Sequence, residues 1–209
     1  MREQDAVKPP ASSPSDSYRR LPFSFDARRM LQDLTRLETE DWIAHFVSQN
    51  YQGNWDVLPL RGPAGATHPV MMIYSDPTCT EFADTPFLER SGYLNEVLQS
   101  FDCSLLTVRL MRLASGSRIL EHRDLDLSLA DGVVRLHVPI RTNPSVDFRV
   151  NGRRVVMREG ECWYLDLSEP HSVVNDGSED RVHLVLDCEV NDWLREQIHR
   201  PGGPASGSS

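Results

Sequence analysis

Three residues of this 209-residue chain are of types that bind metal ions and could act together: His122, Asp124 and His171. His122 and Asp124 stand two positions apart at the end of a strand-like segment, and residues i and i+2 of an extended chain point the same way. His171 opens a later strand-like segment. Two imidazoles and one carboxylate on one side of a ferrous ion leave coordination positions open for other molecules, as in non-haem iron oxygenases. Zinc accepts the same donors, although structural zinc sites usually have four protein ligands.

The H-x-D pattern is common by chance, so a surface His122 beside a solvated Asp124 is the simpler alternative. His45, His68 and His199 stand in no comparable context, and we interpret them as surface or partly buried residues. The metal-site hypothesis therefore needs support from elsewhere in the chain.

Two arginines provide that support because each begins a mostly apolar, strand-like run. Arg181 comes ten residues after His171, and Arg135 precedes His137 on the same strand face. A guanidinium pointing into a barrel is costly unless it meets an anion, and its planar fork matches a carboxylate. A dicarboxylate cosubstrate could bind iron at its keto-acid end and an arginine at its far end. The alternative for each arginine is an edge-strand position with the charged end in water.

A longer pattern connects these residues in the stretch from Arg109 to Trp193. It consists, in order, of Gly116, His122, Arg135-Leu-His137, Asp166-Leu-Ser168-Glu-Pro-His171, Arg181 and a strand ending in Asp187. This order and spacing resemble the aspartyl/asparaginyl β-hydroxylase family of iron(II)- and 2-oxoglutarate-dependent oxygenases. The resemblance covers a little under half of the chain.

The resemblance implies a role for each matching residue. His122 and His171 would bind Fe²⁺, and Arg181 would bind the distal carboxylate of the cosubstrate 2-oxoglutarate. Arg135 and His137 would complete the anion pocket. The family also implies O₂ as a second cosubstrate.

Asp166 and Ser168 would then be supporting residues that hold the turn before His171. Asp124 marks a departure from the best-known animal members, which have glycine at that place, and agrees with many bacterial relatives. Its presence favours a three-ligand metal site, with Asp124 as the third ligand.

The elements that must position these residues fall into two groups. Residues 25–101 are mainly helical in pattern, with helices expected over 26–37, from Thr39 to Phe46 and around 93–101, and one strand over 54–61. From Leu105 the pattern changes to short strands at 105–113, 133–140, 146–150, 154–157, 162–167, 171–174 and 181–190. Asn151-Gly152 predicts a type I′ hairpin turn.

This pattern predicts a mainly β protein, a double-stranded β-helix or cupin-like jelly roll, with the N-terminal helices packed on one outer face. We expect a single oxygenase domain at 20–199, with helical support from 25 to 101 and a β core from 105 to 190. Residues 1–19 and 200–209 are rich in Pro, Ser or Gly and are predicted to be disordered tails.

The amino-acid composition limits which binding partners and which cellular compartment we expect for the protein. The chain has 31 acidic and 22 basic residues, a net charge of −9, and no basic run, which argues against nucleic acid or an anionic membrane as partner. It shows no long apolar stretch and no secretory signal. Its four cysteines form no C-x-x-C pair, so we expect reduced thiols and a cytoplasmic location. The oligomeric state is not indicated.

The predicted function is 2-oxoglutarate-dependent hydroxylation of an sp³ carbon in an amino-acid side chain, because the resemblance implies that substrate class. A free amino acid or a small amino-acid-like molecule is favoured, with Arg112, Arg61 and Trp55 as candidate substrate contacts. The alternatives are hydroxylation of Asp or Asn in a peptide or protein, a non-catalytic cupin-like module that binds metal and carboxylate, a zinc or manganese isomerase, and a metal-free jelly roll.

Overall fold

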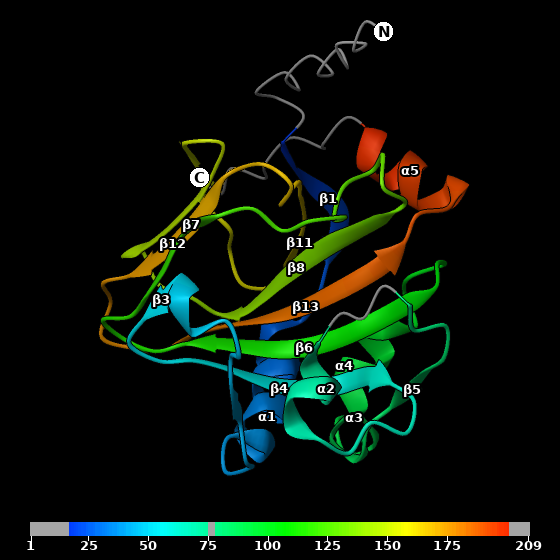
Figure 1. The fold of residues 1–209 in the computed structure, drawn as a ribbon, viewed down its shortest axis with the longest axis horizontal. Coiled ribbons are helices and arrows are strands. Elements are labelled where there is room, and N and C mark those ends of the chain that lie inside the picture. The colour runs from blue at the N-terminus through cyan, green and yellow to red at the C-terminus, as the bar shows by residue number, and fades with distance from the viewer. Residues whose placement is uncertain (1–16, 75–77, 201–209) are drawn as a thin grey trace, which may run out of the picture.

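The computed structural model describes residues 17–74 and 78–200, and two antiparallel sheets form its framework (Figure 1). The larger sheet contains, in spatial order, β1 (Tyr18–Ser24), β11 (Glu161–Leu165), β8 (Val133–Arg141), β13 (Arg181–Glu189), β6 (Leu105–Leu113), β4 (Trp55–Pro63) and β2 (Ile43–Ala44), with β5 (Phe82–Asp84) paired to β4. The smaller sheet contains β10 (Arg153–Arg154), β9 (Val146–Val150), β12 (His171–Asn175), β7 (Arg118–His122) and β3 (Tyr51–Gln52). The predicted mainly β, jelly-roll class is confirmed.

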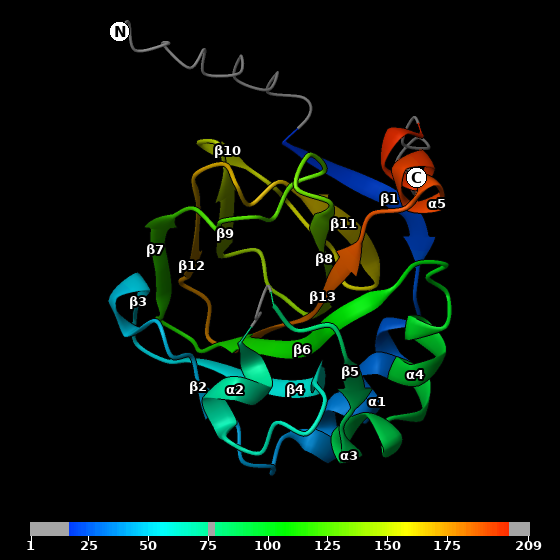
Figure 2. The ribbon, with the colours of Figure 1, turned by 45° about the vertical axis from the view of Figure 1, so that its right-hand side comes forward.

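Most of the helices lie outside this pair of sheets. They are α1 (Ala27–Leu37), α2 (Pro69–Ile73), α3 (Pro86–Glu89), α4 (Gly92–Leu98) and α5 (Asp192–His199), with a 3₁₀ turn at Ser48–Asn50. Figure 2 shows α1, α3 and α4 gathered on one side of β4 and β6. The helix predicted over 26–37 is confirmed as α1, which the Asp26 carboxylate caps by accepting hydrogen bonds from two backbone amides. No helix in the described part of the chain is long and apolar enough to cross a membrane.

Strand alternation divides the apolar residues into two cores. Val108 and Leu110 of β6 pack with the helices, whereas Met111 and Leu113 join the core between the two sheets. Because successive side chains of a strand point to opposite faces, the parity of a position decides which core it enters. The chemistry-bearing residues described below lie on the side of the larger sheet that faces the smaller one.

Several predicted elements agree closely with the structure. The strands predicted over 105–113 and 146–150 have those bounds as β6 and β9. Asn151 and Gly152 connect β9 to β10 with φ values of 49° and 72°, the two positive values that a type I′ turn requires.

Other predictions were wrong. The helix expected from Thr39 to Phe46 is absent, and Ile43–Ala44 instead forms β2 at the edge of the larger sheet, where backbone pairing with β4 outweighs the local helical pattern. The predicted helical support over 25–101 also contains β2 to β5 among its helices.

The predicted tail 1–19 extends too far, because Tyr18 and Arg19 belong to β1 and pair with β11. Composition did not reveal this strand, since its stability comes from a partner strand far along the chain. The rest of that tail, and residues 201–209 of the other, lie outside the described residues.

The buried Asp33 carboxylate joins two of the supporting helices. From α1, its Oδ2 accepts hydrogen bonds from the backbone amides of Tyr93 (2.8 Å) and Leu94 (2.9 Å), in the first turn of α4. Ser91, at the N-cap position of α4, makes no side-chain capping bond. Asp33 therefore caps a helix other than its own.

Replacement of Asp33 by alanine is expected to lower the free energy of unfolding by about 2–3 kcal/mol, because two buried amides lose their acceptor. Urea denaturation measures this loss, and Asp41→Ala, at an exposed position, is the matched control. An equal stability loss in the two variants would contradict the capping role.

Candidate metal centre

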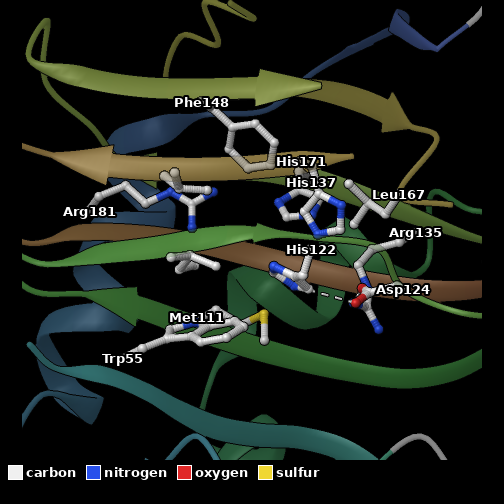
Figure 3. Close-up of a pocket in the computed structure, with 12 residues that line it drawn as sticks. Trp55, Met111, His122, Asp124, Arg135, His137, Phe148, Leu167, His171 and Arg181 are labelled. Carbon is white, nitrogen blue, oxygen red and sulfur yellow. Dashed lines mark hydrogen bonds and ion pairs between the residues drawn. The ribbon is translucent and has the colours of Figure 1, made fainter. Parts of the chain in front are cut away.

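His122, Asp124 and His171 converge at one end of the smaller sheet (Figure 3). His122 is the last residue of β7 and His171 is the first of β12, and the two face each other across the antiparallel ladder. Their ring centroids are 4.3 Å apart. His122 Nε2 lies 3.6 Å from Asp124 Oδ1, and one ligand atom from each residue lies within 4.8 Å of the others. The three side chains that the sequence singled out are thus brought together.

Hydrogen bonds to the backbone orient both imidazoles. His122 Nδ1 lies 2.7 Å from the carbonyl oxygen of Leu120, and His171 Nδ1 lies 3.1 Å from that of Glu169. A carbonyl only accepts, so each Nδ1 carries the proton and each Nε2 keeps a free lone pair. Burial lowers the pKa of His171 to about 4, so its ring is neutral near pH 7. Neutral Nε2 is the form that binds a metal.

The turn before His171 is tied to the H-x-D segment. The backbone amide of Asp124 donates to Leu167 O (2.9 Å), and Arg123 Nη1 donates to Ser168 O (2.6 Å). Within the turn, Ser168 Oγ donates to Asp166 Oδ1 at 2.5 Å. Asp166 and Ser168 therefore hold the loop that precedes His171.

Arg135 orients the carboxylate of Asp124. Its Nη1 donates to Asp124 Oδ2 at 2.6 Å, while Oδ1 of the same carboxylate is the oxygen near His122. Nε and Nη2 of Arg135 also bind both oxygens of Asp187, at 2.6 and 3.0 Å. The guanidinium predicted to bind the cosubstrate thus already has two carboxylate partners.

Asp187, on β13, is the buried anion between two arginines. Besides Arg135, it forms an ion pair with Arg109 and accepts a hydrogen bond from Thr107 Oγ1 at 2.7 Å. Burial alone would raise the pKa of Asp187, but the positive charges of Arg135 and Arg109 outweigh it and hold this pKa below its ordinary value. The carboxylate therefore stays ionised and fixes both cations.

Arg181 differs from these arginines. Its side chain is 2 % exposed, yet none of the ion pairs found in residues 17–74 and 78–200 includes it. Its Nη2 donates to His183 Nδ1 at 2.7 Å, and its guanidinium carbon lies 5.5 Å from the centre of the Phe148 ring. Burial lowers the pKa of Arg181 to about 9. A buried cation without a carboxylate is the feature expected of an anion-binding site.

Two buried histidines adjoin Arg181. The Nδ1 atoms of His137 and His183 lie 3.3 Å apart. Burial, and then the charge of Arg181, hold both pKa values well below the ordinary value, so both rings are neutral.

A small inner cavity of about 40 Å³ lies among these groups. It is lined by the three candidate ligands and by Trp55, Met111, Ile119, Arg135, His137, Phe148, Leu167, Val173 and Arg181. A larger outer cavity of about 360 Å³ shares Trp55, Met111, His122, Asp124 and Arg135 with it. The candidate metal ligands His122 and Asp124 therefore lie where the smaller cavity meets the larger one.

Aromatic side chains form part of the wall of the outer cavity. The rings of His45 and Trp55 are stacked with centroids 3.6 Å apart, and Phe46 and Tyr74 pack edge to face. The Nε1 atom of Trp55 is buried and has no hydrogen-bond partner among the described residues. Trp55 is thus the only one of the three predicted substrate contacts that lines either cavity.

The other two predicted contacts lie elsewhere. Arg112 neighbours Met111 on β6 but has the opposite parity, so it points away from the cavity, where it pairs with Asp56 at 2.9 Å. Arg61 donates to the Asp84 carboxylate and to the backbone carbonyls of Phe82 in β5 and Leu105 in β6. The structure does not bring Arg112 or Arg61 to the site.

Sequence reasoning missed the roles of Arg109, Asp187 and His183. The signal was present in β13, where positions 181, 183, 185 and 187 share a face. Reading the strand from Arg181 in steps of two would have placed His183 and Asp187 on the same face as Arg181.

We expect acid to destabilise the metal-free protein through His137 and His183. Both are neutral when folded but have pKa values near 6.5 when unfolded, so stability is complete above that pH and falls below it. Each contributes a loss of up to about 1.4 kcal/mol per pH unit. Urea denaturation at several pH values with a chelator measures the slope, which His183→Asn should flatten and His68→Asn, at an exposed position, should not. Equal slopes in wild type and His183→Asn would contradict this account.

Comparisons with known proteins agree with this geometry. The family model for aspartyl/asparaginyl beta-hydroxylase matches residues 25–190. The L-proline cis-4-hydroxylase of Rhizobium meliloti (strain 1021) is 30% identical over 169 residues, covering 79% of this chain and 58% of that protein. The L-proline cis-3-hydroxylase 1 of a Streptomyces species is 27% identical over 176 residues, covering 82% of this chain and 60% of that protein. The chain thus spans somewhat more than half the length of these curated relatives.

A solved structure shows the same fold. The prolyl-4-hydroxylase of Pseudomonas putida superposes with a TM-score of 0.51 at 10% sequence identity, covering 85% of this chain and 94% of that one. Because the family model matches most of the chain, the protein belongs to the aspartyl/asparaginyl beta-hydroxylase family.

Proposed function

We propose that the protein is an Fe(II)- and 2-oxoglutarate-dependent hydroxylase acting on a free amino acid. The observation that carries the proposal is the pairing of a His–Asp–His cluster with a buried arginine that has no carboxylate partner among the described residues. The His–Asp–His cluster and Arg181 line the same inner cavity. A 2-oxo diacid needs a metal ion for its keto-acid end and a cation for its distal carboxylate.

The donor set fits a ferrous ion. Two Nε2 lone pairs and one carboxylate oxygen gather at one side of the cavity, which suits a metal that keeps positions open for other molecules. His122, Asp124 and His171 would be its ligands, and Arg135 would hold Asp124 in place. This assignment moves Arg135 from the anion pocket to the support of the metal centre.

The anion pocket fits the distal carboxylate of 2-oxoglutarate. Arg181 supplies the charge, and the aromatic face of Phe148 lies beside it. Leu167, Val173 and Met111 complete a largely apolar wall, which excludes water and strengthens the charge–charge contact. His137 lines the same cavity and would contact the cosubstrate between the metal and Arg181.

When bound together, ferrous iron, 2-oxoglutarate and dioxygen supply the oxidising power to hydroxylate an unactivated C–H bond. The residues of this chain determine where that happens. The outer cavity would hold the substrate, with the stacked His45 and Trp55 as an aromatic wall.

The curated relatives suggest the substrate. Both are named as L-proline hydroxylases, and a compact saturated ring fits a chamber of about 360 Å³ with aromatic walls. We therefore infer a free amino acid, with L-proline as the first compound to test. The screen should measure succinate formation over free amino acids and short peptides, and turnover of Asp- or Asn-containing peptides alone would overturn the inference.

Replacement of His171 by alanine is expected to abolish both iron binding and succinate formation, because a ligand is lost while the backbone pairing of β12 remains. Iron content after anaerobic loading and succinate release measure the two effects. His199→Ala, in α5, is the control. Retention of iron with unchanged affinity and full succinate production in His171→Ala would remove this residue from the metal site.

Replacement of Arg181 by lysine is expected to raise the Kd for 2-oxoglutarate about 10- to 100-fold, because an ammonium cannot reproduce the planar fork. Calorimetric titration of the Mn²⁺-loaded protein measures this constant without turnover. Arg149→Lys, at an exposed position on β9, is the matched control. An unchanged Kd in Arg181→Lys would exclude the proposed contact.

A further inference from the structure

Arg109, Arg135 and Arg181 reach the interior between the sheets, and their partners differ in charge. Arg109 and Arg135 both pair with Asp187, and Arg135 also pairs with Asp124. Arg181 is as deeply buried as Arg109, but its described hydrogen-bond partner is the neutral ring of His183. Within the described part of the chain, carboxylates therefore balance two of the three charges, and none balances the charge of Arg181.

The direction of the Arg181–His183 hydrogen bond follows from the donors. A guanidinium only donates, so His183 Nδ1, 2.7 Å from Arg181 Nη2, must accept with its lone pair. The proton of the ring then lies on Nε2. The nearby Nδ1 of His137, 3.3 Å away, must carry its own proton, since two lone pairs would repel each other. The two histidines thus have defined tautomers.

Because the contact between Arg181 and His183 is buried, the neutral charge of the acceptor affects how strongly Arg181 can attract an anion. His183 is 1 % exposed and shares the face of β13 with Arg181, so the contact is enclosed in the apolar interior. A carboxylate at this position would form a close buried ion pair with Arg181 and would compete with any anion entering the cavity. A histidine supplies the hydrogen bond without neutralising the charge.

We propose that His183 is a positioning residue that orients Arg181 through a neutral hydrogen bond and so reserves the guanidinium charge for the distal carboxylate of the cosubstrate. This inference rests on the proposed function, because it takes 2-oxoglutarate as the anion. It assigns the charge selectivity of the pocket to a residue that need not touch the cosubstrate itself.

The test compares His183→Asn with His183→Asp, two side chains of nearly equal shape. The Asn Oδ1 can take the place of Nδ1 as a neutral acceptor, whereas the Asp carboxylate adds a negative charge. We expect Asn to keep the Kd for 2-oxoglutarate within about threefold of wild type and Asp to raise it at least about tenfold. Calorimetric titration of Mn²⁺-loaded protein measures both.

A cosubstrate analogue with an uncharged tail serves as an internal control. 2-Oxopentanoate keeps the keto-acid end but lacks the distal carboxylate, so its affinity should be nearly the same in the Asn and Asp variants. In steady-state assays, the Asp variant should show a raised KM for 2-oxoglutarate with kcat largely retained. Equal 2-oxoglutarate affinities in the two variants, or equal losses for both cosubstrates, would overturn the proposal.

Folding is checked by thermal unfolding of each variant. If His183→Asp does not fold, His183→Leu replaces it, since leucine removes the acceptor without adding charge. The Leu variant should then bind 2-oxoglutarate at least about tenfold more weakly than the Asn variant, and equal binding would overturn the proposal. Failure of the wild-type protein to bind 2-oxoglutarate would instead reject the proposed function.

Discussion

The carboxylate of Asp187 lies between the guanidinium groups of Arg109 and Arg135, and the arrangement of the candidate metal centre depends on this shared anion. Arg135 binds Asp187 with two of its nitrogens and Asp124 with the third. Without the anion on β13, the Arg109 and Arg135 cations would repel each other in an apolar interior. Arg135 would then no longer be held where it orients the Asp124 carboxylate. The Asp124 carboxylate, a candidate metal ligand, is thus positioned from the larger sheet, although it follows a strand of the smaller one.

The two sheets contribute different functions to the same cavity. The smaller sheet supplies both histidines through paired strands, so the ladder itself sets their separation. The larger sheet supplies the arginines, Asp187 and the neutral histidines from β6, β8 and β13. Helices on the far side of the larger sheet take no part in the site, but they bury its other face and keep it rigid.

The sequence predicted the parts of this structure that local spacing determines. His122, Asp124, His171 and Arg181 were singled out from strand parity and spacing along the chain, and all four line one cavity. The two-residue turn at 151–152 was predictable for the same reason. The roles of His122, Asp124 and His171 as metal ligands, and of Arg181 in cosubstrate binding, remain predictions.

Features that depend on distant partners could not be predicted. The segment containing Ile43 has a helical pattern, yet β4 pairs with it as a strand. The sequence context of Arg135 suggests an anion-binding residue. In the structure, however, Arg135 is paired with Asp187, which lies 52 positions away in sequence. In both cases a long-range contact outweighs a local preference, which is the usual limit of reading one sequence.

The two histidines lie on the smaller sheet and Arg181 lies on the larger one. A diacid bound to a metal at one end and to Arg181 at the other would therefore bridge the two sheets. The distance between the sheets would then select cosubstrates by the length of their carbon chain.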